Sequence, residues 1–319
     1  MPSQRLTFLA LATTLGLTLT ACGGSGQAAA PYDDGVIKIG TDGRTQVHEA
    51  FLEEAEKAGV EVELVEFTDY NQPNAALTSG DLDMNWFQHG AFLADYRNNS
   101  GEDIVPVGST SIYPLGLYSE RYESLDQIQE GDEIAVPNDA INLARALLLL
   151  QSAGLVEFTS DTTAPSELDI DTEASKVRVT PVSAEQTVLS MSSTAGAVVN
   201  NTFLTRADID PNSALYSDGE DNENALPYVN FFAATGANRD DETLHRVADL
   251  FHTDSVLAAE QAETKNTAVS EDVPQEQLIQ VVDTYAEDLQ KCPRRPAVTT
   301  RGPGATRSSC ASRTSPRPW

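Results

Sequence analysis

The chain has 319 residues, with 49 acidic against 20 basic side chains and a net charge of −29 at pH 7. The acidic excess argues against nucleic acid or anionic lipid as a partner of the folded part, because both are themselves negatively charged. The cysteines, Cys22, Cys292 and Cys310, leave the long middle of the chain without an internal disulfide, so a large apolar core must stabilise it.

The N-terminus is predicted to be a targeting segment. After a positively charged start, the apolar run over residues 6–21 is too short for a comfortable membrane span, which takes about 20 residues. The run ends at Ala21-Cys22, which resembles the lipobox of bacterial lipoproteins. The resemblance implies removal of residues 1–21, acylation of Cys22, a tether over residues 22–35, and anchoring to the cell membrane outside the cytoplasm. An ordinary secretory peptide is the alternative.

Strand and helix patterns alternate from residue 36 onward. Residues 36–40 and 60–64 are predicted as strands with a helix over 46–58 between them, an order that makes a right-handed parallel unit. Further strands are predicted at 83–87, 104–107, 133–136, 177–179, 195–199 and 229–233, and helices at 73–79, 91–97, 124–128, 140–150, 184–191, 239–251, 255–265 and 275–290. The chain is therefore predicted to be α/β with parallel sheets.

Three stretches interrupt this alternation. Residues 157–175 and 217–224 are acidic and are predicted as surface loops. Residues 292–319 hold six Arg, five Pro and no acidic residue, and the rest of the chain without them has a net charge of −35. Such a tail buries little and is predicted to be disordered. A basic arm and an artefactual end of the gene are the two interpretations, and we assign it no function.

Two polar residues stand out on the very apolar helix predicted after the Pro-Asn-Asp loop. Asn142 and Arg145 are three residues apart, so they share one face, and they lie near the helix N-terminus, where an anion is favoured. An Arg among apolar residues needs a partner. A ligand carboxylate, which the guanidinium binds with two hydrogen bonds, and a structural acidic residue are equally good alternatives.

Four rings are expected near one crevice. Tyr70, Phe87, His89 and Phe92 follow or end predicted strands, and ligands bind at the carboxyl ends of strands in open α/β sheets. Taken singly, the two Phe are better explained as core residues. Together the four rings favour an apolar pocket.

Patterns typical of an enzyme or a metal centre do not occur in the sequence. The four His lie in no metal-binding spacing such as His-Glu-x-x-His, and there is no Gly-x-Ser-x-Gly elbow. The predicted strand-to-helix loop over residues 41–45 lacks the glycine spacing that nucleotide binding needs. We therefore predict no reaction, no cofactor and no metal site.

Several motifs resemble, in the right order, those of the methionine-binding lipoproteins of the NlpA family. They are Tyr-x-x-Pro-Asn at 70–74, Gly-Asp-Leu-Asp-x-Asn-x-Phe-Gln-His at 80–89, Pro-x-Gly-Leu-Tyr-Ser at 114–119, Pro-Asn-Asp-x-x-Asn-x-x-Arg at 137–145, Ala-Val-Val-Asn at 197–200 and Pro-Tyr-Val-Asn at 227–230. The resemblance covers about residues 36–251. It implies a substrate-binding protein of an ABC importer with a two-lobed, type II periplasmic-binding-protein-like fold, each lobe a mainly parallel sheet flanked by helices.

The resemblance also implies how the chain is divided. Lobe 1 is expected to comprise residues 36–113 and 226–291, and lobe 2 residues 114–225. Arg145 is expected to bind the carboxylate of an amino acid with Asn142 beside it, and Asn200 and Asn230 to orient the amino and carboxylate groups. Tyr70, Phe87, His89 and Phe92 are expected to surround the thioether side chain.

The expected partners follow from this resemblance. They are a methionine-like amino acid, the ABC permease with its ATPase, and the membrane through the lipid on Cys22; the protein is expected to be a monomer that binds no nucleic acid. The preference for L- or D-methionine stays open. A receptor for another hydrophobic amino acid or a short methionine-containing peptide, and a surface adhesion lipoprotein, are the alternatives.

Overall fold

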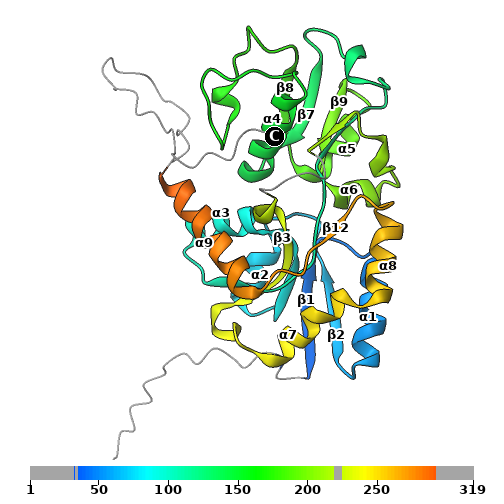
Figure 1. Cartoon of the computed structure of the whole chain (residues 1–319), viewed down its shortest axis with the longest axis vertical. Coiled ribbons are helices and arrows are strands. Elements are labelled where there is room, and N and C mark those ends of the chain that lie inside the picture. The colour runs from blue at the N-terminus through cyan, green and yellow to red at the C-terminus, as the bar shows by residue number, and fades with distance from the viewer. Residues whose placement is uncertain (1–31, 33–34, 219–224, 292–319) are drawn as a thin grey trace, which may run out of the picture.

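The structure is a computed structural model that describes residue 32 and residues 35–218 and 225–291. The predicted signal peptide, most of the tether and the basic tail lie outside these residues. Each of two lobes is built on a five-stranded sheet, and Figure 1 shows one lobe above the other. In the described part of the chain, no helix combines the length and the apolar character that crossing a membrane requires.

Lobe 1 contains the sheet with strand order β2-β1-β3-β11-β4. Its strands are β1 (Val36–Thr41), β2 (Glu61–Glu66), β3 (Met84–His89), β4 (Ile104–Ser109) and β11 (Asn230–Thr235), and its helices are α1 (Gln46–Lys57), α2 (Pro73–Ser79), α3 (Gly90–Ser100), α7 (Glu242–Asp249), α8 (Asp254–Glu263) and α9 (Gln275–Lys291). The core between sheet and helices is rich in buried aromatic side chains, among them Phe51, Trp86, Phe232 and Phe251.

Lobe 2 contains the sheet with strand order β10-β6-β9-β7-β8. Its strands are β6 (Gly116–Tyr118), β7 (Glu133–Pro137), β8 (Arg178–Val182), β9 (Gly196–Val199) and β10 (Tyr216–Ser217), and its helices are α4 (Ala140–Ser152), α5 (Thr187–Ser190) and α6 (Asn201–Arg206). The apolar face of α4 is buried against this sheet, where Leu147 and Leu150 pack with Ile134 and Val136. A small sheet of β5 (Ser111–Ile112) and β12 (Val269–Ser270) lies beside the connection between the lobes.

The predicted α/β order is confirmed, but each sheet contains a strand that runs against the others. β1 pairs in parallel with β2 and β3, whereas β11 is antiparallel to β3 and to β4. In lobe 2, β6 is antiparallel to both β9 and β10. β11 comes after the whole of lobe 2, so the chain enters the first sheet from the opposite end. Each sheet is therefore mainly parallel, as predicted, and β11 and β6 are the strands that run against the others.

Several helix predictions are wrong in extent. The helix predicted over 124–128 is only a single 3-10 turn, Leu125–Gln127, and the helix predicted over 184–191 divides into a 3-10 turn, Ala184–Gln186, and the short α5. Both segments are too short for the cooperative gain that sustains a helix. α7 begins at Glu242 because Asp241 accepts hydrogen bonds from two backbone amides of its first turn.

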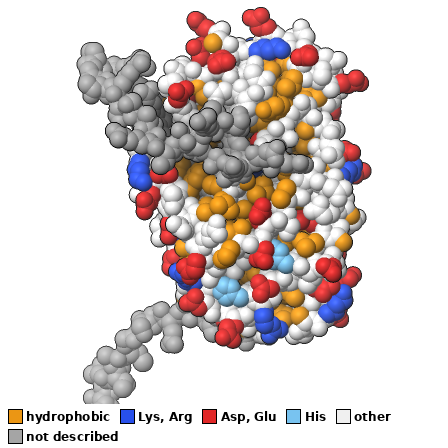
Figure 2. Space-filling model, in the orientation of Figure 1, with side chains coloured by type: hydrophobic (Ala, Val, Ile, Leu, Met, Phe, Trp, Pro, Cys, Tyr) orange, Lys and Arg blue, Asp and Glu red, His pale blue; other side chains and the backbone are white. Residues whose placement is uncertain are grey.

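The surface agrees with the composition. Figure 2 shows acidic side chains spread over the visible face, with few basic ones among them. Most of the described Lys and Arg side chains form ion pairs with neighbouring carboxylates, such as Lys265 with Asp210 at 3.1 Å.

Candidate ligand-binding site between the lobes

One cavity of about 100 Å³ lies between the lobes and is lined by residues of both. This is several times the roughly 10–15 Å³ that a single water molecule needs. All eight residues predicted to bind a ligand line it, namely Tyr70, Phe87, His89, Phe92, Asn142, Arg145, Asn200 and Asn230. The structure therefore brings together residues spread over 160 positions of the sequence, while their contact with a ligand stays a prediction.

Arg145 is held on the cavity wall by three groups. Its side chain is 8% exposed; Nε donates to Asp218 Oδ2 at 2.6 Å, and Nη2 donates to the Tyr113 carbonyl at 3.1 Å. The guanidinium also lies 4.4 Å from the centre of the Tyr228 ring, a cation–π distance. Among the described residues these hydrogen bonds use Nε and Nη2, which leaves Nη1 for a ligand.

Asp218 is the acidic structural partner of Arg145, which the sequence predicted only as a residue type. It lies in the acidic stretch 217–224, predicted as a surface loop, and its side chain is 11% exposed. Its second oxygen, Oδ1, accepts from the Leu115 amide at 2.9 Å. The sequence indicates only that an Arg among apolar residues needs an acidic partner. It does not show which of the 49 acidic residues is that partner.

A chain of amide contacts fixes the orientation of Asn200. Asp139 caps α4 by accepting from the Asn142 amide at 2.9 Å, and its two oxygens also accept from Asn142 Nδ2 at 3.1 and 3.0 Å. Asn142 Oδ1 must then face Asn200, whose Nδ2 donates to it at 2.9 Å. Asn200 Oδ1 is left buried without a hydrogen-bond donor among the described residues. A buried acceptor without a donor is costly, so this atom favours a ligand that donates.

This network changes what Asn142 contributes. Both polar atoms of its side chain are used, Nδ2 by Asp139 and Oδ1 by Asn200. In this arrangement Asn142 positions Asn200. Asn230, at the start of β11, lies opposite His89 in the sheet and donates to the Tyr228 carbonyl at 3.4 Å.

The part of the cavity wall that comes from lobe 1 is aromatic. Ring centres are 6.1 Å apart for Tyr70 and Phe87, 6.3 Å for Tyr70 and Phe92, and 5.7 Å for Phe87 and Phe92. Tyr70 also lies 5.4 Å from Phe203 on α6 of the other lobe. The three rings of lobe 1 therefore form one apolar surface, and Tyr70 continues it across the gap between the lobes.

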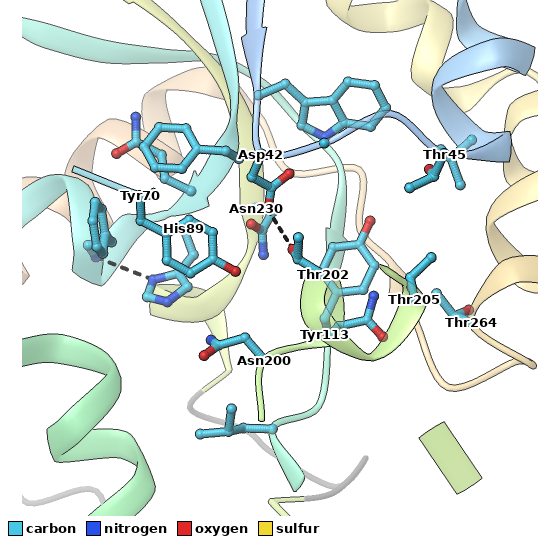
Figure 3. Close-up of a pocket in the computed structure, with 18 of the residues that line it drawn as sticks. Asp42, Thr45, Tyr70, His89, Tyr113, Asn200, Thr202, Thr205, Asn230 and Thr264 are labelled. Atoms are coloured by element: carbon cyan, nitrogen blue, oxygen red, sulfur yellow. Dashed lines mark hydrogen bonds between the residues drawn. The ribbon is translucent and has the colours of Figure 1, made fainter. Parts of the chain in front are cut away.

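His89 is a neutral donor at this site. Burial, together with the charge of Arg145, lowers its pKa to about 3. Nδ1 accepts from the Phe92 amide at 3.3 Å and so caps α3, which places the proton of the neutral ring on Nε2. Figure 3 shows this ring beside Tyr70 in the cavity. His89 contributes a hydrogen-bond donor without adding charge.

Further residues of the cavity were not singled out from the sequence. Asp42 lies in the loop over residues 41–45, which the sequence analysis tested only for nucleotide binding, and Thr202 on α6 donates to Asp42 Oδ2 at 2.5 Å across the lobes. Burial raises the pKa of Asp42 to about 6. Glu263 also lines the cavity, and burial raises its pKa as well. No group of three or more His, Cys, Asp or Glu able to hold a metal ion occurs among the described residues.

Comparison with known proteins identifies the family to which these features belong. The family model for NlpA lipoproteins matches residues 37–272. The chain belongs to the NlpA lipoprotein family. Members of the NlpA family are substrate-binding proteins of ABC transporters and not enzymes, as the sequence analysis predicted.

Individual NlpA relatives cover most of the chain. A protein of Salmonella typhi named D-methionine-binding lipoprotein MetQ is 34% identical over 261 residues, which is 79% of this chain and 93% of that protein. The substrate-binding protein of a methionine transporter from Streptococcus pneumoniae superposes with a TM-score of 0.69 at 34% identity, covering 74% of this chain and 95% of the other. Protein PG110 from Staphylococcus aureus gives 0.74 at 32% identity, covering 78% and 99%. The predicted two-lobed type II fold is thereby confirmed.

Proposed function

We propose that the protein is a lipid-anchored receptor that binds methionine between its lobes and delivers it to an ABC permease. The observation that carries the proposal is the pairing of two unlike walls in one cavity. Arg145 Nη1 and the free Asn200 Oδ1 are a donor and an acceptor for the carboxylate and ammonium groups of an amino acid. The rings of Tyr70, Phe87 and Phe92 face the side chain.

The chemistry of methionine suits this aromatic wall. Its thioether is polarisable and gains about 0.3–1.5 kcal/mol from each favourable contact with a ring. A charge-assisted hydrogen bond to the guanidinium contributes about 1.5–3 kcal/mol. Two of these relatives have names that refer to methionine, one of them to its D form, which supports the same ligand class.

The organisation of the chain follows from this role. We propose that residues 36–113 and 226–291 form lobe 1 and residues 114–225 form lobe 2, which close on the ligand as a hinged pair. The closed form is what the permease with its ATPase recognises, and the receptor acts as a monomer.

Calorimetry on the full chain in detergent tests the ligand. We expect L- or D-methionine to bind at least tenfold more tightly than leucine. Norleucine, which replaces the sulfur with a methylene, should bind roughly fivefold more weakly than methionine, because it loses about 1 kcal/mol of sulfur–aromatic attraction. Tighter binding of glycyl-methionine than of either enantiomer would favour the peptide alternative. Binding of none of these ligands would contradict a receptor role and favour an adhesion protein.

The lipid anchor has its own test. We expect Cys22→Ser to move the protein from the membrane fraction into the soluble or secreted fraction, because the acyl chains contribute about 0.8 kcal/mol for each buried methylene. Mass analysis of the intact wild type should show the acyl groups on the residue that follows the cleavage site. Cys310→Ser is the matched control and should stay with the membrane. A Cys22→Ser protein that remains membrane-bound after a carbonate wash would rule out the anchor.

A further inference from the structure

Asp42 lies where the cavity meets the contact between the lobes. It follows directly on β1, at the carboxyl end of that strand, and lines the cavity. Figure 3 shows its carboxylate bonded to Thr202, with Tyr113 and Asn230 beside it. Among the described residues, Thr202 is the only side chain that donates a hydrogen bond to Asp42, and it uses Oδ2, which leaves Oδ1 for a ligand.

No cation forms an ion pair with this carboxylate within the described part of the chain. None of the described Lys, Arg or His side chains lies within ion-pair distance of Asp42. The charge of Arg206 lowers the pKa of Asp42, but Arg206 Nη2 donates its hydrogen bond to the Phe67 carbonyl. Glu263 lines the same cavity and adds a second negative charge. A carboxylate that is largely removed from water and has no ion-pair partner is unfavourable. Closing the lobes on an empty cavity therefore carries a penalty at Asp42.

The titration of Asp42 agrees with this geometry. Burial raises its pKa to about 6, the Thr202 hydrogen bond and the charge of Arg206 oppose the rise, and Glu263 adds to it. Asp42 in turn contributes to the raised pKa of the Tyr70 and Tyr113 phenols, which face it from lobe 1 and from the connection between the lobes. All groups around Asp42 other than Arg206 are neutral donors or acids, so a cationic ligand group would relieve the penalty.

We propose that Asp42 makes lobe closure depend on a protonated amine in the ligand, with the ammonium group contacting Oδ1 while Thr202 of the other lobe holds Oδ2. This inference rests on the proposed function and adds to it a residue that determines specificity. A ligand with a carboxylate and a thioether but no ammonium group would satisfy Arg145 and the rings and still leave Asp42 without a counter-charge.

The test compares methionine with its hydroxy analogue, 2-hydroxy-4-(methylthio)butanoate, in which a hydroxyl group replaces the ammonium group. Calorimetry is done on the full chain in detergent, with the methionine enantiomer that binds more tightly. We expect the wild type to prefer methionine at least 100-fold. Asp42→Asn should weaken methionine binding at least tenfold and leave the affinity for the hydroxy analogue unchanged or higher, because the amide loses the attraction for the ammonium group and also removes the uncompensated charge.

Two further variants separate this role from a purely structural one. Thr202→Val removes the bond between the lobes but keeps the charge, so it should weaken both ligands by the same factor. Asp126→Asn, on an exposed residue of lobe 2, is the matched control and should change neither affinity. Melting temperatures of the unliganded proteins within 2 °C of the wild type, a margin of roughly 1 kcal/mol or less, would show that each variant is folded.

Two results would overturn the inference. One is an Asp42→Asn protein that keeps its affinity for methionine within twofold. The other is an Asp42→Asn protein that loses both ligands to the same degree, which would make Asp42 a latch without a role in selecting the ligand. A wild type that binds neither compound is a different result, because it overturns the proposed function itself and this inference with it.

Discussion

Replacing Arg145 with alanine is expected to weaken methionine binding roughly 150-fold, measured by calorimetry. The physical reason is the loss of the charge-assisted hydrogen bond to the ligand carboxylate, worth about 3 kcal/mol at a buried site. The variant also removes the ion-pair partner of Asp218, whose Oδ2 accepts from Arg145 Nε at 2.6 Å. The Asp218 carboxylate is then a largely buried charge without compensation. We therefore expect a lower melting temperature as well.

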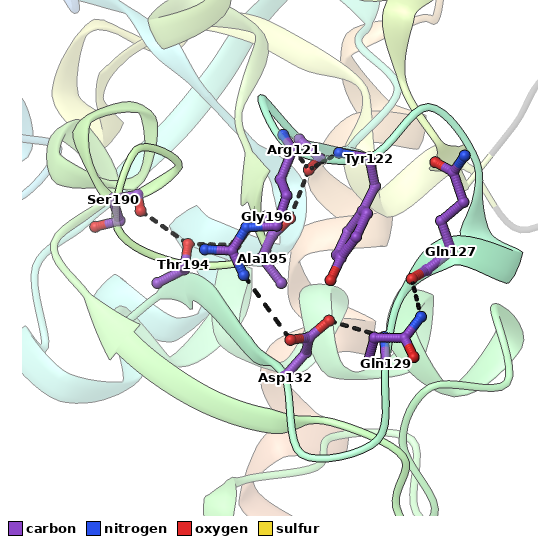
Figure 4. Close-up of polar contacts among 10 residues, drawn as sticks. Arg121, Tyr122, Gln127, Gln129, Asp132, Ser190, Thr194, Ala195 and Gly196 are labelled. Carbon is purple, nitrogen blue, oxygen red and sulfur yellow. Dashed lines mark hydrogen bonds and ion pairs between the residues drawn. The ribbon is translucent and has the colours of Figure 1, made fainter.

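A second substitution separates these two effects. Arg145→Ala combined with Asp218→Asn removes the stranded charge, so it should recover most of the lost stability without recovering methionine binding. A double variant that recovers both would assign Arg145 a purely structural role. Arg121→Ala is the matched control. Arg121 lies in the same lobe, is half exposed, and forms a long and therefore weak surface ion pair, with 3.9 Å between its Nη1 and Asp132 Oδ1 (Figure 4). It should bind methionine as the wild type does.

Replacing Phe232 with alanine is expected to lower the free energy of unfolding by about 3–5 kcal/mol, the usual cost of removing a buried Phe ring. Phe232 lies on β11, is fully buried, and packs with ring centres 4.8 Å from Trp86 and 5.4 Å from Phe51. The loss should appear as a lower urea midpoint in circular dichroism. Because β11 pairs with both β3 and β4, the whole of lobe 1 is affected.

The control for this prediction is an apolar residue whose side chain is mostly exposed to solvent. Leu189 is 75% exposed, so Leu189→Ala should move the urea midpoint little. Equal shifts for the two variants would contradict the assignment of Phe232 to the core of lobe 1.

Local pattern was enough to predict the helix that carries Arg145. The apolar run over 140–150 predicts a helix, and the structure has α4 at Ala140–Ser152 with Asp139 as its cap and Gly154 in the left-handed region just after it, at φ +70°. Strand-then-helix order likewise predicted β1, α1 and β2 within one or two residues. These signals are readable because the periodicity of a helix or strand is contained in neighbouring residues.

Short strands and reversed strands were not predictable in the same way. β5, β6, β10 and β12 have two or three residues each, which is too few for an alternating pattern. The antiparallel direction of β11 depends on where the chain returns from lobe 2, and its own residues do not record that. The aromatic residues lie within or next to short motifs and were predictable as a set, whereas Asp218 meets Arg145 only through the tertiary fold and was not.

The sequence by itself determined the α/β class, the family and the eight residues placed at the cavity, because each depends on residue type and on short spacings. Only the tertiary structure decided how these residues are used. It paired Arg145 with Asp218, turned Asn142 toward Asp139 so that Asn200 Oδ1 is left without a donor, and brought Asp42 against Thr202 across the lobes. Arg145 and Asp218, Asn142 and Asn200, and Asp42 and Thr202 are far apart in the chain, so their contacts cannot be read from local spacing. Burial at these contacts then shifts the pKa of Asp42 and leaves Asn200 Oδ1 without a hydrogen-bond donor among the described residues.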